Sequence, residues 1–266
     1  MASILVFDSG VGGLTVQQHI RHVLPHAVIH YLADNARFPY GELPEPILVA
    51  GCVDLIQRFM AKQAQAKAAI DLVVIACNSA STLVLEPLRQ VLSVPVVGVV
   101  PAIKPAAQQS HHGVIGLLAT PGTVRRAYTN TLIRQYATNC QVLRLGSSEL
   151  VVMAEQRLSG QECNIAQLRQ LLLPYTQAPI PPDVVVLGCT HFPLIAQEIQ
   201  QVLGEKVQLV DSGAAIARRV ETLLSDGVKK SDASQISTYY HTGAQPNMAL
   251  VAALQQYQLP QVQLFD

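Results

Sequence analysis

Two of the five cysteines stand where a thiol can do chemistry. Cys77 and Cys189 each follow an apolar run and precede polar residues near the expected start of a helix. At such a position the backbone N–H groups and the helix dipole lower a thiol pKa from about 8.5, which favours the reactive thiolate. Cys52, Cys140 and Cys163 lie within or beside ordinary helix and strand patterns, and we expect them to be core residues. The first two are therefore our candidate functional pair.

His191 lies two residues after Cys189. It is either a hydrogen-bonded structural residue or a group that tunes the neighbouring thiol. Cysteine and histidine are also zinc ligands, but a Cys-x-His pair has neither the C-x-x-C nor the H-x-x-x-H spacing of known zinc sites. We predict no bound metal.

Two hydroxyl groups follow the expected strand at residues 114–118. Thr120 and Thr123 offer two hydroxyls at a helix N-terminus, which would hold a carboxylate or phosphate, or would only cap the helix. Arg125 and Arg126 follow directly, and we expect them on a solvated helix surface. This segment is therefore a candidate anion cradle.

The first expected strand ends at Asp8, before a glycine-rich turn. The turn lacks the G-x-G-x-x-G spacing of dinucleotide sites, so we interpret it as a tight strand-to-helix connection. Residues 39–41, Pro-Tyr-Gly, have the composition of a turn, and the tyrosine hydroxyl is a possible ligand contact. Both turns follow expected strands, so their polar residues add to those already found at strand ends.

These polar groups are carried by a repeated order of strands and helices. Continuous rather than alternating apolarity indicates strands buried on both faces, and the strand–helix–strand order indicates parallel, doubly wound sheets. Such sheets bind ligands beyond the carboxyl ends of their strands. The expected strands cover residues 4–7, 28–32, 72–76, 94–99, 114–118, 142–145, 184–187 and 207–210, and the clearest helices cover 45–69, 79–92, 123–136 and 193–203.

A chain of 266 residues is long enough for one or two domains. The tripeptide Asp-Ser-Gly occurs at residues 8–10 and again at 211–213, and the two candidate cysteines fall in different halves. We predict an α/β fold with two doubly wound, mainly parallel-sheet domains and the active site in the cleft between them. The first domain is expected to comprise residues 1–98 and 211–266, and the second residues 99–210.

Composition excludes several classes of function. The 18 basic and 18 acidic residues balance, without the concentrated charge that binding to a phosphate backbone requires, so nucleic acid is not the expected ligand. No apolar run reaches the roughly 18 residues of a membrane span, and the N-terminal residues have no basic region or cleavage site typical of export. We expect a cytoplasmic protein that does not bind a membrane.

Four segments together resemble one family, the glutamate racemases. They read Phe-Asp-Ser-Gly-Val-Gly-Gly at 7–13, Pro-Tyr-Gly at 39–41, Ala-Cys-Asn-Ser at 76–79 and Leu-Gly-Cys-Thr-His-Phe-Pro at 187–193. The resemblance spans nearly the full chain. It implies an enzyme without a cofactor that interconverts L- and D-glutamate and supplies the D-isomer for bacterial peptidoglycan. It also implies two α/β domains with the site between them, in a homodimer.

The same resemblance implies roles for individual residues. Cys77 and Cys189 would be the two bases, assisted by Asp8 and His191, respectively. Ser79 stands where the family more usually has threonine, which keeps the hydroxyl. The glutamate site would be lined by Ser9, Pro39, Tyr40, Gly41, Asn78, Ser79, Thr120, Thr123, Thr190 and Glu155.

Some members of the family carry an N-terminal extension associated with activation by a peptidoglycan precursor. In this sequence the first expected strand begins within a few residues of Met1. On this basis we do not expect that regulation.

The types and positions of these residues are consistent with racemisation by two bases. Inverting a stereocentre by proton exchange needs one group to remove a proton from one face and another to deliver a proton to the opposite face. Two strand-end thiols in separate halves suit this task, and no lysine in the motifs is placed to form a Schiff base. Three alternatives stay open: an aspartate racemase, whose relatives have glutamate in place of His191; a carboxylate-binding protein without catalysis; and a zinc hydrolase using Cys189 and His191.

Overall fold

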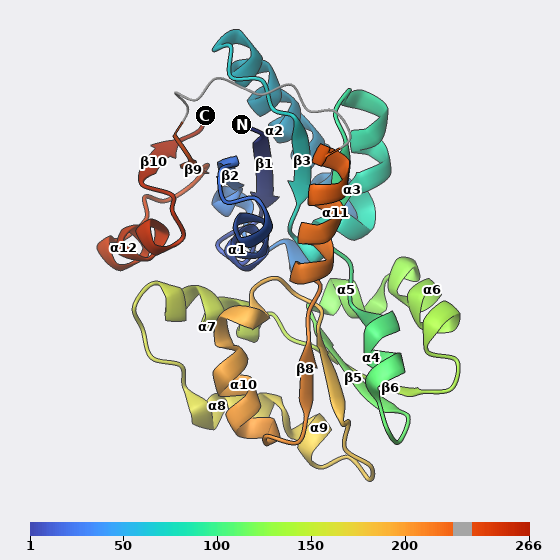
Figure 1. The fold of residues 1–266 in the computed structure, drawn as a ribbon. Coiled ribbons are helices and arrows are strands. Elements are labelled where there is room, and N and C mark those ends of the chain that lie inside the picture. Colours follow the sequence, from blue (N-terminus) through green and yellow to red (C-terminus); the bar gives the residue numbers. More distant parts are fainter. Residues whose placement is uncertain (226–235) are drawn as a thin grey trace.

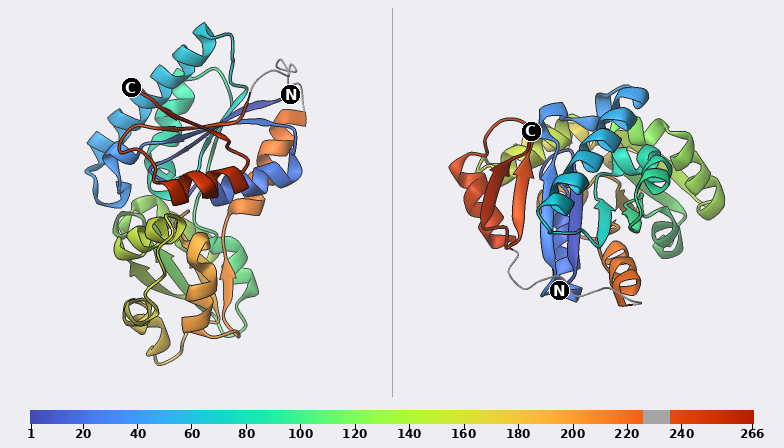
Figure 2. Two further views of the ribbon diagram at one scale, coloured as in Figure 1. Left: turned by 90° about the vertical axis from the view of Figure 1, so that its left-hand side faces the viewer. Right: turned by 90° about the horizontal axis from the view of Figure 1, so that it is seen from above.

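The computed structural model describes residues 1–225 and 236–266, which form two β-sheets flanked by helices. Figures 1 and 2 show the sheets in two halves of the molecule, with both chain termini in the same half. No helix in the described residues is long and apolar enough to cross a membrane. The strands are β1 (Ser3–Asp8), β2 (Val28–Ala33), β3 (Leu72–Ile75), β4 (Val96–Gly98), β5 (Val114–Ala119), β6 (Gln141–Gly146), β7 (Val184–Leu187), β8 (Gln208–Val210), β9 (Thr238–His241) and β10 (Gln261–Leu264).

All strand pairings within the described residues are parallel. The larger sheet has the order β10-β9-β2-β1-β3-β4, and the smaller sheet has the order β6-β5-β7-β8. Parallel strands end at the same edge of their sheet, so the residues that follow β1, β2 and β3 come together, as do those that follow β5 and β7. The prediction of an α/β fold with two parallel sheets is confirmed.

Helices cover both faces of each sheet. The α-helices are α1 (Leu14–Val23), α2 (Glu45–Gln65), α3 (Asn78–Val91), α4 (Ile103–Gln109), α5 (Pro121–Arg125), α6 (Ala127–Tyr136), α7 (Glu149–Leu158), α8 (Ile165–Leu171), α9 (Leu173–Thr176), α10 (Ala196–Leu203), α11 (Gly213–Ser225) and α12 (Met248–Gln256). Three short 3-10 helices are η1 (Asn35–Arg37), η2 (Tyr40–Glu42) and η3 (Phe192–Ile195).

The core of the larger sheet explains the continuous apolarity of its strands. Every residue of β1 is buried. Ile4 and Val6 belong to the core that includes residues of α1 and α11, whereas Leu5 and Phe7 belong to the core that includes residues of α2 and α3. Because successive strand residues point to opposite faces, a strand covered on both sides needs apolar residues throughout.

The two sheets draw on different parts of the chain. The larger sheet uses residues between 3 and 98 together with β9 and β10, and the smaller sheet uses residues between 114 and 210. Helix α11 packs against α1 beside the larger sheet. This distribution supports our proposed division into residues 1–98 plus 211–266 and residues 99–210.

The expected helix over residues 123–136 is interrupted. Arg126, with φ of −63° and ψ of 146°, adopts an extended conformation between α5 and α6. As a result its side chain turns inward and is only 8% exposed, whereas Arg125 stays exposed. The expectation that both arginines lie on a solvated surface is therefore wrong for Arg126, because the helix break changes the direction of its side chain.

Candidate active site

The residues that follow strands of both sheets meet in one pocket. Cys77 reaches it from the end of β3 in the larger sheet, and Cys189 from the end of β7 in the smaller sheet. Both thiols are free and are 5% exposed. The full lining consists of Ser9, Pro39, Tyr40, Gly41, Cys77, Ser79, Thr120, Ser148, Val151, Cys189 and His191.

Cys77 is the residue immediately before α3. Its Sγ lies 3.9 Å from the hydroxyl of Ser9. Burial raises the pKa of the Cys77 thiol well above its usual range, and the negative charge of Asp8 adds to this effect, although the N–H of Ala80 and the Ser9 hydroxyl act in the opposite direction. We expected the helix N-terminus to lower this pKa, but in the closed pocket the loss of water outweighs the amide donors.

Cys189 belongs to a chain of three polar side chains. The Nδ1 atom of His191 lies 3.8 Å from Cys189 Sγ, and its Nε2 atom lies 2.8 Å from Glu155 Oε1. Burial lowers the pKa of His191, but its hydrogen bonds to Cys189 and Glu155 and the charges of both residues raise it well above the usual value. A protonated His191 therefore places a positive charge next to the Cys189 sulfur atom.

Asp8 is fully buried between the two halves. It accepts hydrogen bonds from the Gly10 N–H at 2.9 Å and from the Thr190 hydroxyl at 3.0 Å. Burial raises the pKa of Asp8, while the charge of His191 and these two hydrogen bonds lower it, and the net direction is upward. Asp8 thus acts on Cys77 through its charge, and the structure gives no hydrogen bond between the two side chains.

A cluster of hydroxyl groups forms another wall of the site. The Ser79 hydroxyl lies 2.9 Å from that of Thr120 and 3.3 Å from that of Thr123, and the two threonine hydroxyls are 3.0 Å apart. Thr120 also caps α5 by accepting the N–H of Thr123. The capping alternative from the sequence is therefore observed, and because Thr120 also lines the pocket, binding of an anion there stays a prediction.

Not all predicted site residues line the pocket. Glu155 was expected to contact substrate, but it stands behind His191, where it also accepts the Val11 N–H at 2.8 Å. Gly10 permits this approach, since a Cβ there would lie 2.0 Å from Glu155 Oε1. The other predicted residues outside the lining, all buried, are Asp8, Asn78, Thr123 and Thr190.

Sequence analysis missed three residues. Ser148 and Val151, from the start of α7, line the pocket, and the Ser148 hydroxyl is buried without a hydrogen-bond partner in the described structure. Arg126 donates to the Ser79 carbonyl and, at 2.7 Å, to the Thr82 hydroxyl, so it joins the α5–α6 segment to α3. The Ser-Ser-Glu sequence at 147–149 is typical of a helix start, and the Ser147 hydroxyl accepts the Leu150 N–H at 3.2 Å, which leaves the hydroxyl of Ser148 free for the pocket.

The pocket is nearly closed. It leaves about 10 Å³ of free space, room for about one water molecule. An amino acid does not fit into this space as it stands, so the lining residues must move apart to admit one. Within residues 1–225 and 236–266, no group of three or more His, Cys, Asp or Glu side chains is arranged to hold a metal ion.

Comparison with known proteins identifies the family. Residues 15–220 match the Asp/Glu/Hydantoin racemase family. The chain is 54% identical over 257 residues to a glutamate racemase of Shewanella sp. (strain MR-4), an alignment covering 94% of this chain and 92% of the relative. Escherichia coli glutamate racemase in complex with L-glutamate and the activator UDP-MurNAc-ala has a TM-score of 0.92 and 44% identity, covering 99% of this chain and 98% of that one. Glutamate racemase isoform RacE1 from Bacillus anthracis has a TM-score of 0.77 and 30% identity, covering 100% and 97% of the two chains. This chain belongs to the Asp/Glu/hydantoin racemase family.

Proposed function

We propose that this protein is a glutamate racemase that interconverts L- and D-glutamate by proton transfer between two cysteines, without a cofactor. The observation that carries the proposal is the meeting of Cys77 and Cys189 in one pocket from two different sheets. The glutamate racemases of similar sequence and fold support the choice of substrate.

In the proposed reaction the two thiols act on opposite faces of the Cα atom. With L-glutamate, the Cys189 thiolate removes the Cα proton and the Cys77 thiol delivers its own proton to the other face. The cysteines then hold exchanged protonation states, and D-glutamate reacts in reverse with Cys77 as the base. The raised pKa of Cys77 and the imidazolium beside Cys189 favour the form that accepts L-glutamate.

Neutral donors hold the substrate in this proposal. Ser79, Thr120 and Ser148 line the pocket, and in the proposed complex their hydroxyls donate to a carboxylate, which gains negative charge as the Cα proton leaves. The Ser148 hydroxyl has no hydrogen-bond partner among the described residues, whereas those of Ser79 and Thr120 exchange their bonds to neighbouring hydroxyls for bonds to the substrate. The buried donors also favour glutamate over aspartate, because a shorter side chain would leave some of them unpaired.

The test is incubation with L-glutamate in deuterium oxide, followed by circular dichroism and mass spectrometry. We expect loss of optical rotation together with deuterium at Cα. Cys77→Ser and Cys189→Ser should each reduce racemisation by a factor on the order of 10² to 10⁴, because serine is a far weaker acid–base group. Cys52→Ser and Cys140→Ser are the matched controls. Near wild-type racemisation by either pocket variant would refute the two-base reaction.

Three further features of the proposal follow from the family. We propose that the product D-glutamate enters peptidoglycan synthesis, that the enzyme acts in the cytoplasm, and that it forms a homodimer. Size-exclusion chromatography with light scattering tests the last point, and a monomer at assay concentration would contradict it.

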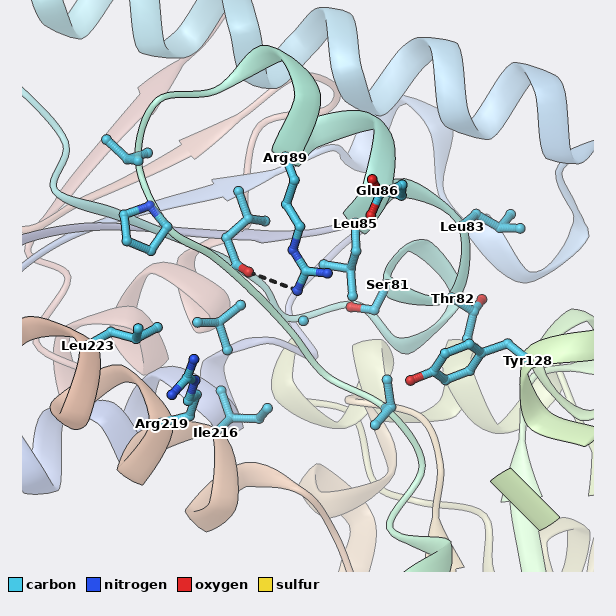
Figure 3. Close-up of a pocket in the computed structure, with 16 residues that line it drawn as sticks. Ser81, Thr82, Leu83, Leu85, Glu86, Arg89, Tyr128, Ile216, Arg219 and Leu223 are labelled. Atoms are coloured by element: carbon cyan, nitrogen blue, oxygen red, sulfur yellow. Dashed lines mark hydrogen bonds between the residues drawn. The ribbon is translucent and has the colours of Figure 1, made fainter. Parts of the chain in front are cut away.

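A groove that contains neither cysteine supports a second proposal. It measures about 790 Å³ and lies between α3, β4 and α11, with Tyr128 of α6 at one end. Figure 3 shows Arg89 and Arg219 entering it from different helices. Because the Escherichia coli relative is described with the activator UDP-MurNAc-ala, whose diphosphate suits arginine side chains, we propose that this groove binds such an activator. This proposal goes against our expectation from the short N-terminal segment.

The groove proposal is tested by measuring racemisation with and without UDP-MurNAc-Ala. We expect Arg89→Ala and Arg219→Ala to lose the activation while the basal rate stays unchanged, since neither residue lines the cysteine pocket. An activator that has no effect on the wild type would refute the proposal.

A further inference from the structure

The loop between β2 and α2 carries three residues of the pocket lining, Pro39, Tyr40 and Gly41. It contains no strand, only the short helices η1 and η2. Arg37 ties the loop to the Gly51 carbonyl of α2, and a second set of hydrogen bonds comes from the other end of the chain: residues 242–244, which follow β9 directly. The parallel pairing of β2 with β9 brings these two segments together at the carboxyl end of the strands, and Figure 1 shows the two strands side by side.

Asn35 joins the loop to this C-terminal segment with its whole side-chain amide. Its Oδ1 atom accepts the N–H groups of Thr242, at 3.0 Å, and Gly243, at 2.7 Å. Its Nδ2 atom donates to the Ala244 carbonyl at 3.1 Å. The side-chain amide therefore forms hydrogen bonds with backbone N–H and C=O groups of residues 242–244, as the backbone of a neighbouring strand would.

Thr242 extends the connection toward the pocket. Its hydroxyl accepts the Ala36 N–H at 3.2 Å and donates to Asp34 Oδ1 at 2.9 Å. The other carboxylate oxygen of Asp34 accepts a hydrogen bond from the Tyr40 hydroxyl. A continuous path of hydrogen bonds thus runs from the C-terminal segment to a residue of the pocket lining.

The two backbones also touch at Gly243. A Cβ atom at this position would lie 2.8 Å from the Ala36 nitrogen and 3.0 Å from the Ala36 Cα atom. Both are backbone atoms, which cannot turn aside as a side chain does. Any larger residue at 243 would therefore displace the loop itself.

We propose that Asn35, Thr242 and Gly243 form a clamp through which the C-terminal segment sets the position of Tyr40 and Gly41 against the substrate. They are positioning residues, since none of them lines the pocket. The inference rests on the proposed glutamate racemase activity. Because the loop belongs to the binding site for both enantiomers, loosening it weakens the binding of L- and D-glutamate alike.

The test is steady-state kinetics in both directions on Asn35→Ala, Thr242→Val and Gly243→Ala. We expect KM for both enantiomers to rise about tenfold, with kcat changed much less. Asn35→Ala removes three hydrogen bonds and Thr242→Val removes two, whereas Gly243→Ala displaces the loop by steric contact. A purely structural defect would instead lower kcat with the fraction of folded enzyme and leave KM unchanged. Asn35→Asp keeps the acceptor for both N–H groups, so it should restore most of the affinity.

Asn247→Ala is the matched control. This asparagine lies three residues after the C-terminal segment, but it caps α12 by accepting the Leu250 N–H at 2.8 Å and makes no hydrogen bond to the loop. We expect its KM to equal that of the wild type. Wild-type racemisation together with an unchanged KM in Asn35→Ala would overturn the clamp, whereas absence of racemisation in the wild type would refute the proposed function instead.

Discussion

Glu155→Gln tests how the buried histidine supports Cys189. In the wild type the Glu155 carboxylate lies 2.8 Å from His191 Nε2, with side-chain exposures of 23% and 1%, respectively. Glutamine keeps an oxygen acceptor but loses the charge. A hydrogen bond to a charged group contributes about 1.5–3 kcal/mol and a neutral one about 0.5–1.5 kcal/mol, so the substitution should cost about 1–1.5 kcal/mol. This corresponds to about one unit in the pKa of His191.

The sign of the pH effect follows from the direction of that shift. The pKa of His191 is raised in the wild type, and the substitution moves it back toward its usual value. If protonated His191 supports the Cys189 thiolate, activity is lost as the pH rises through this pKa. The alkaline limb of the pH profile should therefore move to lower pH by about one unit in the variant.

The assay is kcat/KM for both enantiomers across the pH range. Where the variant has lost its proton and the wild type has kept it, we expect kcat/KM to fall about tenfold. The fall must be equal in both directions, since the enantiomers have equal free energy, whereas kcat alone can differ. Glu149→Gln, at an exposed residue of the same helix, is the control. An alkaline limb that does not move in Glu155→Gln would refute this account of His191.

Two other predictions concern residues that sequence analysis did not identify. Ser148→Ala removes the unpaired hydroxyl from the pocket lining, and we expect KM for glutamate to rise about fivefold; an unchanged KM would show that this hydroxyl does not reach the substrate. Arg126→Ala removes the guanidinium that donates to the Ser79 carbonyl and to the Thr82 hydroxyl, so we expect unfolding to cost about 2 kcal/mol less, measured by thermal denaturation. Arg125→Ala, at an exposed position, should keep the wild-type stability, and equal losses in both variants would contradict the structural role of Arg126.

Much of the fold was predictable because parallel strands have a local signature. A strand buried on both faces must be apolar throughout, so strands such as β3 and β7 were visible as runs of Val, Ile and Leu. The strands β9 and β10 were not predicted, because β9 contains Thr, Tyr and His and the edge strand β10 alternates with glutamine. Membership of these two strands in the larger sheet depends on pairing with residues far away in the sequence.

The sequence by itself determined which polar residues stand at the carboxyl ends of the strands, since the end of an apolar run is a local property. Only the tertiary structure decided which other residues each of them contacts. Thr190 donates to Asp8 across 182 positions of the chain, and Glu155 pairs with His191 instead of lining the pocket. The same holds for the raised pKa of Cys77, because the loss of water around a thiol depends on everything packed against it.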